Sequence, residues 1–461
     1  MRPLPAVLRQ QLREAFGEGW REDPADCLAY GYDNSRRSLP PQAVALAAED
    51  SQIERLVHAC AEHAVPLTVR GRGTNTTGAS VPLAGGVVLS LERMNRVLRV
   101  SAGDRLLVAQ AGCLNSTVQQ AAAAEGLFWP PDPTSAGYST IGGNLACGAG
   151  GPRAVKYGTA REHVLGLRAI SGAGHWLRTG CQTSKGVVGY DLTRLLVGSE
   201  GTLAIITEAT LRLLPLAPAR RTLRAAYRDV ESAAAAVARL MAQPATPSSL
   251  EFMDGDAVAL AQAWHDTGVP AGTGALLLLE VDGEAETLPA QVRAVAAAAA
   301  GAGLIEWREA TAAAEAETLW ACRKALSPSL RQLAPKKVNE DVAVPVTRLP
   351  ELVRGLQRLS RDHALRIVTF GHAGNGNLHV NLLADPDDPA QLRAIEACLP
   401  AVFRLVLDLG GTLSGEHGVG IDKRDFVAWE IEPATLELMR GLKRVFDPQG
   451  ILNPGKTLPA A

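Results

Sequence analysis

The sequence predicts an α+β protein with two domains. Its 461 residues exceed the usual size of a single hydrophobic core. Residues 43–214 are rich in glycine and short β-type runs, whereas residues 222–400 alternate Ala-rich helical stretches with strands. The composition changes at residues 215–221 (PLAPARR), which we expect to form a linker. Helices and hairpin-like strands distributed in this way are typical of the α+β class.

The first domain is expected to combine a clear helix with several short strands. Residues 50–63 (DSQIERLVHACAEH) have the pattern of an amphipathic helix. The β-type runs lie at 66–70, 85–91, 105–112, 195–201 and 204–214.

The second domain is expected to place helices over one face of a sheet. Alanine is a strong helix former, so we interpret the Ala-rich stretches 231–243 and 288–303 as structural helices. The strands expected between and after them lie at 274–281, 338–346 and 366–370. Residues 437–461 read as a helix that ends in a turn-rich tail.

Composition limits the possible partners and locations. Apolar residues make up 47% of the chain, charged residues 20%, and the formal net charge is −2. This balance gives no general attraction to nucleic acid or anionic lipid, so we expect small-molecule or protein partners. No signal-peptide pattern and no run near the ~20 apolar residues of a membrane span is visible. The seven scattered cysteines contain no CxxC pair, which predicts a reduced, cytoplasmic protein without cysteine-bound metal.

The segment 371–381 (GHAGNGNLHVN) has an unusual density of groups that can bind a ligand. In the strand expected after its glycines, Asn377, His379 and Asn381 share one face. A turn at the glycines could fold His372 back beside His379. Two imidazoles on a rigid hairpin form half of a transition-metal site. The alternative is that these histidines are ordinary core or surface groups.

A second segment, 415–420 (GEHGVG), offers groups that could complete such a site. Glu416 supplies a carboxylate and His417 a third imidazole.

Three glycine clusters in the first domain indicate a large bound ligand. Residues 71–78 (GRGTNTTG) follow a strand, and glycines there let main-chain NH groups approach an anion such as a pyrophosphate. A flexible turn is the alternative. The other clusters, 128–158 and 197–213, could line the rest of a dinucleotide such as FAD. The pattern is not GxGxxG, so a nicotinamide site is poorly supported. The formal GxxxxGKT match at 450–457 is rejected, because no helix can follow it.

Taken together, these motifs resemble the FAD-dependent D-2-hydroxyacid dehydrogenases of the vanillyl-alcohol-oxidase (PCMH-type) fold. This group includes D-lactate dehydrogenase, the FAD-dependent subunit of glycolate oxidase and D-2-hydroxyglutarate dehydrogenase. The resemblance covers nearly the whole chain, with the family's motifs in the family's order. The motifs are RGRGTNTTG, PPDP with TIGGN, YDLTRLLVGSEGTL, NEDVAVP, GHAGNGNLH, GEHGVG and FDPQGILNPGK.

The resemblance implies three parts of the chain. Residues 1–218 would form the FAD-binding domain, and residues 219–412 an antiparallel-sheet substrate (cap) domain. Residues 413–461 would complete the active site and return to the FAD domain. The FAD contacts implied are Arg70, Gly71, Arg72, Gly73, Thr74, Asn75, Gly78, Pro131, Asp132, Ser135, Gly142, Gly143, Asn144, Gly148, Ile206 and Asn453. Covalent members carry a flavin-linked His where this chain has Thr74, so the FAD should be noncovalent.

The resemblance also implies the substrate site. His372, His379 and Glu416 would bind a divalent metal, with zinc expected and iron or manganese as alternatives. His417 would take the hydroxyl proton while hydride leaves for flavin N5. The substrate contacts implied are Arg323, Lys337 and Asn381.

The expected activity is oxidation of a D-2-hydroxy acid to the 2-oxo acid, with D-lactate preferred. D-2-hydroxyglutarate and glycolate are alternative substrates, and a noncatalytic flavin-binding subunit of a redox complex is the alternative from another class. Electrons would leave to a separate quinone, cytochrome or electron-transfer flavoprotein. The expected location is cytoplasmic, with peripheral attachment at the inner membrane as an alternative, and a homodimer is an open possibility.

The sequence departs from the commonest family pattern at several positions. Asn375 stands where many members carry an acidic residue, and Ala204 replaces a glycine. Gly148 replaces an asparagine, which puts that flavin contact in doubt.

Overall fold

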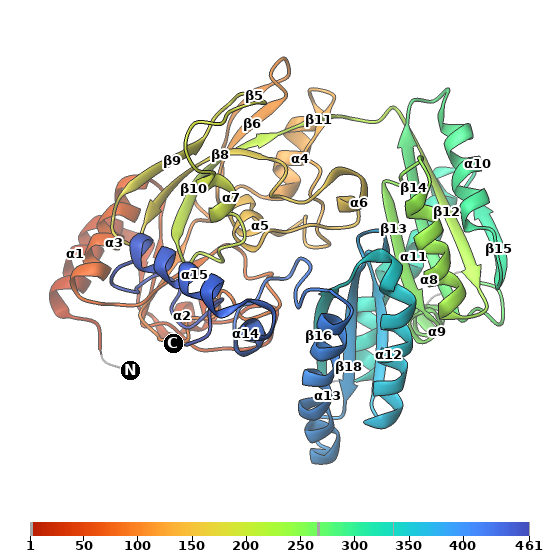
Figure 1. Cartoon of the computed structure of the whole chain (residues 1–461). Helices are drawn as coiled ribbons and strands as arrows, with labels where there is room; N and C mark the ends of the chain where they lie inside the picture. The colour runs from red at the N-terminus through yellow and green to blue at the C-terminus, as the bar shows by residue number, and fades with distance from the viewer. Residues whose placement is uncertain (1–2, 265–267, 335, 461) are drawn as a thin grey trace. The chain divides into compact units, whose positions relative to one another are not determined.

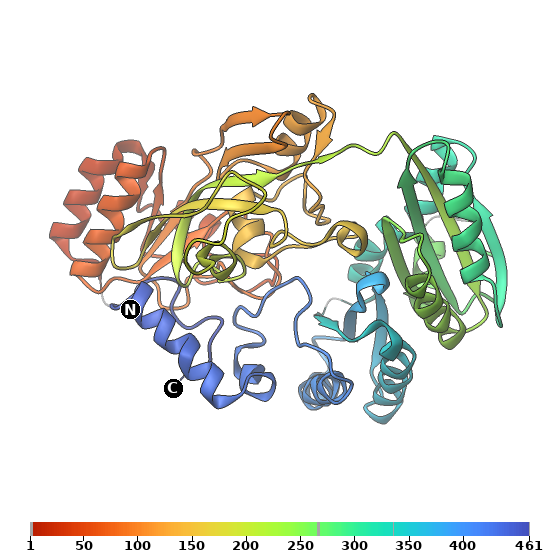
Figure 2. The same ribbon diagram turned by 45° about the horizontal axis from the view of Figure 1, so that its top comes forward.

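The chain folds into two compact units, described separately below. The computed structural model describes residues 3–264, 268–334 and 336–460. The first unit comprises Met1–Gly151, Gly158–Leu216 and Glu416–Ala461, and the second comprises Pro152–Tyr157 and Ala217–Gly415. Figure 1 and Figure 2 show the helices and strands of each unit.

The first unit begins with a small sheet packed against helices. Its strand order is β1 (Trp20–Arg21), β2 (Ala43–Leu46), β4 (Val87–Ser90) and β3 (Leu67–Arg70), with β4 parallel to both β2 and β3. Helices α1 (Ala6–Phe16) and α3 (Asp50–Glu62) bury apolar residues at helical spacing, such as Leu8 with Leu12 and Ile53 with Leu56. Helix α2 (Pro24–Tyr30) is capped by Asp23, whose side chain accepts a hydrogen bond from Ala25 N.

A second sheet of the first unit is antiparallel. Its order is β5 (Val97–Ser101), β6 (Leu106–Gln110), β10 (Ala204–Arg212), β8 (Val164–Ser171) and β9 (Trp176–Gly180). A two-stranded ribbon joins β7 (Leu127–Phe128) to β11 (Leu214–Pro215). The helices placed among these strands are α4 (Asn115–Ala123), α5 (Ile141–Cys147) and α7 (Leu192–Leu196).

The C-terminal segment folds back into the first unit. After α14 (Val427–Glu430) and α15 (Pro433–Phe446), the tail runs beside β3. Leu67 N donates to Ile451 O at 2.8 Å, and Asn453 N donates to Leu67 O at 2.8 Å.

The second unit is built on a seven-stranded antiparallel sheet. Its order is β15 (Leu304–Glu309), β12 (Ala219–Tyr227), β14 (Ala275–Gly283), β13 (Ser249–Asp254), β17 (Arg366–Gly371), β18 (Asn377–Ala384) and β16 (Lys336–Ala343).

Helices cover both faces of this sheet, so the expectation of helices on one face was wrong. On one face lie α8 (Val230–Ala242), α10 (Leu288–Ala299), α12 (Leu349–Asp362) and α13 (Pro389–Asp408); on the other lie α9 (Gly255–Trp264) and α11 (Ala313–Leu333). The reason is visible in β14. Leu276 and Leu278 pack in the core with α9 and α11, while Leu277 and Leu279 on the opposite face are equally buried. A continuous apolar run of this kind is typical of a strand buried on both faces.

Candidate active site

The polar residues of strands β16 and β18 lie on one face of the sheet. Their antiparallel register pairs Asn339 with Asn381 and Asp341 with His379. Directly paired residues project to the same side of the sheet. Leu383, two residues after Asn381 and therefore on the same face, belongs to the core formed with α9 and α11. The face of the sheet that α9 and α11 cover therefore carries a row of polar side chains, which we call the polar row: Asn339, Asp341, His379 and Asn381.

A tight turn brings His372 back beside His379, as the glycine pattern predicted. The turn contains a short 3₁₀ helix, Ala373–Asn375, and ends at Gly376 with φ +72°. A Cβ atom at Gly376 would lie 1.9 Å from the carbonyl oxygen of Val344, so only glycine fits. The two imidazole rings have centroids 5.2 Å apart and are nearly perpendicular, at 86°.

Glu251 of β13 connects His372 to Arg323 of α11. Its Oε1 lies 2.5 Å from His372 Nδ1, and its Oε2 accepts a hydrogen bond from Arg323 Nε at 2.8 Å. The Glu251 side chain is fully buried. Burial by itself would raise the pKa of Glu251, but the charges and hydrogen bonds of His372 and Arg323 outweigh it and lower the pKa to about 2. The ion pair with Arg323, whose guanidinium is always charged, favours the ionised form of Glu251.

The ionised Glu251 also fixes the tautomer of His372. A carboxylate only accepts hydrogen bonds, so Nδ1 of His372 carries the proton. In the neutral ring Nε2 is then the nitrogen with the lone pair. This is the arrangement of a metal-binding histidine held by an outer carboxylate.

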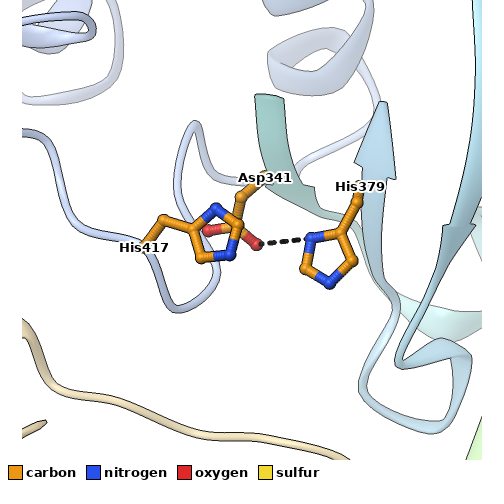
Figure 3. Close-up of side chains that lie close together, drawn as sticks. All are labelled: Asp341, His379 and His417. Atoms are coloured by element: carbon orange, nitrogen blue, oxygen red, sulfur yellow. Dashed lines mark ion pairs between the residues drawn. The ribbon is translucent and has the colours of Figure 1, made fainter. Parts of the chain in front are cut away.

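Asp341 stands in a similar position beside His379. The Asp341 carboxylate is fully buried, and Oδ1 lies 3.8 Å from His379 Nδ1 (Figure 3). The same carboxylate accepts hydrogen bonds from Asn377 Nδ2 at 2.6 Å and from Ser414 Oγ at 3.2 Å. These bonds hold Asp341 in place, so each of the two histidines has a buried carboxylate as a neighbour.

The predicted substrate contacts lie on or above the same face. The guanidinium of Arg323 lies over the ring of Phe370, with Cζ 4.7 Å from the ring centroid. Asn381 is fully buried, and its Nδ2 donates to the carbonyls of Val368 and His379 at 3.0 and 3.2 Å. Oδ1 of Asn381 has no hydrogen-bond partner among the described residues. Lys337 is half-buried at the position of β16 that pairs with Leu383.

Glu416 and His417 belong to the first unit, where hydrogen bonds anchor them. Glu416 Oε2 accepts a bond from Gly151 N at 2.7 Å, and His417 O accepts one from Asn75 Nδ2 at 3.1 Å. Both side chains are half-buried. The residue before them, Gly415, ends the second unit, and its amide donates to Asp341 O at 3.3 Å. The chain thus passes directly from the polar row to Glu416 and His417.

The loop 71–78 is braced by its own asparagine. Oδ1 of Asn75 accepts hydrogen bonds from the amides of Thr77 and Ala79, both at 2.9 Å. A Cβ atom at Gly71 would lie 2.5 Å from Thr140 Oγ1, so the loop and the TIGGN segment touch through a glycine.

The remaining predicted FAD contacts all lie in the first unit. Arg70 is buried and donates to the carbonyl of Tyr32, whereas Arg72 is exposed and pairs with Glu92 at 3.4 Å. Gly148 has φ +70° and ends helix α5, a reason for glycine there that is independent of any ligand. Three of the other positions, Gly142, Gly143 and Asn144, lie within α5, and Ile206 lies on β10. The rest lie in loops and turns: Gly73, Thr74, Gly78, Pro131, Asp132 and Ser135.

Comparison with known proteins identifies the family. Residues 216–457 match the family described as "FAD linked oxidases, C-terminal domain", and residues 41–180 match "FAD binding domain". A Bacillus subtilis protein named glycolate oxidase subunit GlcD is 36% identical over 451 residues, covering 97% of this chain and 96% of that protein. The chain belongs to the family of FAD-linked oxidases.

Other relatives of this FAD-linked oxidase carry different substrate names. A D-lactate dehydrogenase of Anaerostipes hadrus is 33% identical, covering 90% of this chain and 89% of that protein. A D-2-hydroxyglutarate dehydrogenase of Stutzerimonas stutzeri is 33% identical, covering 99% of both. The solved structure of p-cresol methylhydroxylase superposes with a TM-score of 0.82 at 16% identity, covering 98% of this chain and 96% of that one. The predicted vanillyl-alcohol-oxidase fold is confirmed, and the protein is an FAD-linked oxidoreductase.

The first unit fits the cofactor that the family implies. Three buried polar atoms near the glycine loops have no hydrogen-bond partner among the described residues: Thr76 Oγ1, Ser139 Oγ and Asn144 Nδ2. Buried polar groups normally have partners, so these atoms are suited to a polar ligand.

Within the described residues, no helix is both long and apolar enough to cross a membrane.

Sequence reasoning missed Glu251, Asp341, Glu200 and Lys456. Glu200 is buried and accepts hydrogen bonds from the amides of Val419 and Gly420, so it holds the segment after His417. Lys456 is buried and donates to Ala79 O at 2.8 Å. An acidic residue between the apolar residues of a strand, as in LEFM, was the available signal for Glu251.

Proposed function

We propose that this FAD-linked oxidase converts a small D-2-hydroxy acid, D-lactate in preference to others, to the 2-oxo acid. The observation that carries the proposal is the buried cluster of His372, His379, Glu251 and Arg323. It combines paired imidazoles of metal-binding type with a guanidinium suited to a carboxylate.

We assign cofactor binding to the first unit. The loop 71–78, the TIGGN segment and Asn453 would hold FAD, which supplies a hydride acceptor when bound. The side-chain amide of Asn453 donates to Ala79 O at 2.9 Å and Glu200 O at 2.6 Å, so its role is to fix the loop against the tail. Because Thr74 offers no imidazole for a flavin bond, acid precipitation should release the yellow colour into the supernatant. Colour retained in the pellet would contradict a noncovalent cofactor.

We assign a divalent metal to His372, His379 and Glu416. The donor set of two imidazoles and one carboxylate favours zinc, with iron and manganese as alternatives. A metal bound there would lower the pKa of a substrate hydroxyl and orient the hydroxy acid. The support for Glu416 is its place in the chain, one residue after Gly415, which is bonded to Asp341.

The remaining side chains have roles that follow from their chemistry. Arg323 presents a planar guanidinium, held by Glu251 and by the Phe370 ring, for the substrate carboxylate. Asn381 and Lys337 contribute polar contacts on the same face. His417 takes the hydroxyl proton, and its backbone is held by Asn75 of the cofactor loop. These assignments account for positioning, carboxylate binding and proton removal with groups of this chain.

Anaerobic mixing with a panel of D- and L-2-hydroxy acids tests the proposal. We expect D-lactate to bleach the visible flavin absorbance fastest, D-2-hydroxyglutarate and glycolate to react more slowly, and L-isomers to leave it unchanged. Bleaching by none of the acids would refute the activity. Faster bleaching by D-2-hydroxyglutarate or glycolate would keep the reaction class and change the substrate.

The relative named as a subunit suggests a second possibility, a role inside a larger redox complex. Electrons must leave the reduced protein to a separate acceptor such as a quinone, a cytochrome or an electron-transfer flavoprotein. If the isolated chain is reduced by substrate but reoxidised only when such an acceptor is added, the chain is the substrate-oxidising component. If it assembles with partners and is never reduced by substrate, its role is noncatalytic.

A further inference from the structure

We propose that Glu251 is a positioning residue that holds the metal-binding histidine and the substrate-binding arginine with one carboxylate. The inference deepens the proposed function and rests on it. Each oxygen of Glu251 has its own partner, His372 Nδ1 for Oε1 and Arg323 Nε for Oε2. Metal binding and carboxylate binding therefore depend on the same buried side chain.

The location of Glu251 makes it suited to this role. It lies on β13, an inner strand of the seven-stranded sheet, between β14 and β17. Its side chain is fully buried, so no water competes for its oxygens and its position is set by the sheet. A carboxylate on an inner strand holds its partners more rigidly than one on a loop does.

The bond to His372 acts on the metal. It keeps the proton on Nδ1 and leaves the lone pair on Nε2, and it fixes the plane of the ring. Outer carboxylates of this kind typically strengthen metal binding by about 10–100-fold.

The bond to Arg323 acts on the substrate. Because Glu251 engages Nε, the terminal NH groups of the guanidinium are the ones directed to other ligands. The guanidinium also lies over the Phe370 ring, with Cζ 4.7 Å from the ring centroid. The guanidinium plane is thus fixed before the substrate carboxylate arrives, which reduces the entropy cost of binding.

The test compares Glu251→Gln with a matched control, Glu306→Gln. Glutamine keeps the size of the side chain and leaves no cavity, but it cannot accept from both partners with two carboxylate oxygens. Glu306 of β15 is half-buried and accepts from Nε of a buried arginine of the same sheet, Arg224, at 3.0 Å, so it controls for the loss of a carboxylate that is paired with an arginine. Circular dichroism and the ratio of flavin to protein absorbance check that both variants fold and retain FAD.

Two readouts are needed, metal affinity and the KM for D-lactate at saturating zinc. For Glu251→Gln we expect zinc affinity, measured by competition with a chromogenic chelator, to fall by about 10–100-fold. We also expect KM at saturating zinc to rise by about tenfold or more, because a hydrogen bond to a charged group that orients Arg323 is lost. Glu306→Gln should match wild type in both. Glu251→Asp, which retains the charge but is too short to reach both partners, should restore only one of the two properties.

The outcomes separate this inference from the proposed function. Wild type that binds zinc and is bleached by substrate, together with Glu251→Gln unchanged in either readout, overturns the shared role and leaves the proposed function intact. If wild type neither binds zinc nor is bleached, both fail. Loss of both properties in Glu251→Gln, with Glu306→Gln normal, supports the shared role.

Discussion

The glycine loop of the first unit and the polar row of the second unit are assembled in different ways. The fold of the loop 71–78 starts from bonds within the loop, since Asn75 accepts from the amides of Thr77 and Ala79, and distant segments then hold it in place, as Ile421 N does by donating to Thr77 O at 2.8 Å. The polar row of β16 and β18 is completed by Glu251 of β13, Arg323 of α11 and His372, which come from parts of the chain that are far apart in sequence. The shape of the loop thus begins with bonds inside one short segment, whereas the polar row exists only when the strands pair in the correct order.

The largest expected effect separates proton removal from metal binding. His417→Ala should lower the rate of flavin reduction by about 10²–10⁴-fold, the usual contribution of a general base. Bound zinc should be unchanged, because His417 is not among the proposed ligands. His372→Ala should lose both zinc and flavin reduction, and FAD content should stay normal in both variants. Metal analysis and stopped-flow absorbance measure these quantities, and a His417→Ala protein that is reduced at the wild-type rate would remove His417 from the mechanism.

A smaller effect tests how strictly the hairpin turn is fixed. Gly376→Ala places a non-glycine residue at φ +72° and a Cβ atom 1.9 Å from a backbone oxygen. We expect it to lower the free energy of unfolding by about 3 kcal/mol or more and to weaken zinc binding, because strain at positive φ alone costs about 1–3 kcal/mol.

Gly126→Ala is the control for that prediction. Gly126 also has a positive φ, +70°, but an added Cβ would meet nothing within 4 Å. Gly126→Ala should lower the free energy of unfolding by only about 1 kcal/mol, the lower end of the cost of strain at positive φ, and should leave zinc binding unchanged. Urea unfolding of both variants measures the difference, and equal losses of stability would show that the contact with Val344 is unimportant.

The smallest effect concerns the buried Lys456 of the first unit. Burial lowers the pKa of Lys456 to about 7, although Asp33 and Glu200 act in the opposite direction. Between pH ~7 and ~10.4 the Lys456 side chain holds a proton in the unfolded chain that it lacks in the folded protein. The free energy of unfolding therefore increases as the pH rises through this range. Relative to Lys456→Met, wild type should gain about 1 kcal/mol per pH unit across the lower part of this range. Urea unfolding at pH 7, 8 and 9 measures it, and parallel curves would contradict a lowered pKa.

The difference between the two regions also explains what the sequence could predict. The period-2 alternation predicts that His379 and Asn381 share one face of their strand. The glycines predict the turn that brings His372 back beside His379. Both signals lie within one short segment of the sequence. Glu251 and Asp341 could not be assigned, because their partnerships depend on β13, β17, β18 and β16 being neighbours in that order. The helices on both sheet faces were missed for a similar reason, since the Leu run of β14 shows burial without showing what covers each face.

The central claim is that His372 and His379 hold a metal needed for oxidation of the substrate. The most direct measurement is the rate at which D-lactate bleaches the flavin, under anaerobic conditions, in zinc-loaded, chelator-stripped and zinc-reloaded protein. A bound metal contributes several kcal/mol to stabilising the charge that develops on oxygen, so stripping should slow bleaching by about 100-fold or more. Reloading should restore the rate. Equal rates in stripped and loaded protein, with metal removal verified by elemental analysis, would contradict the account.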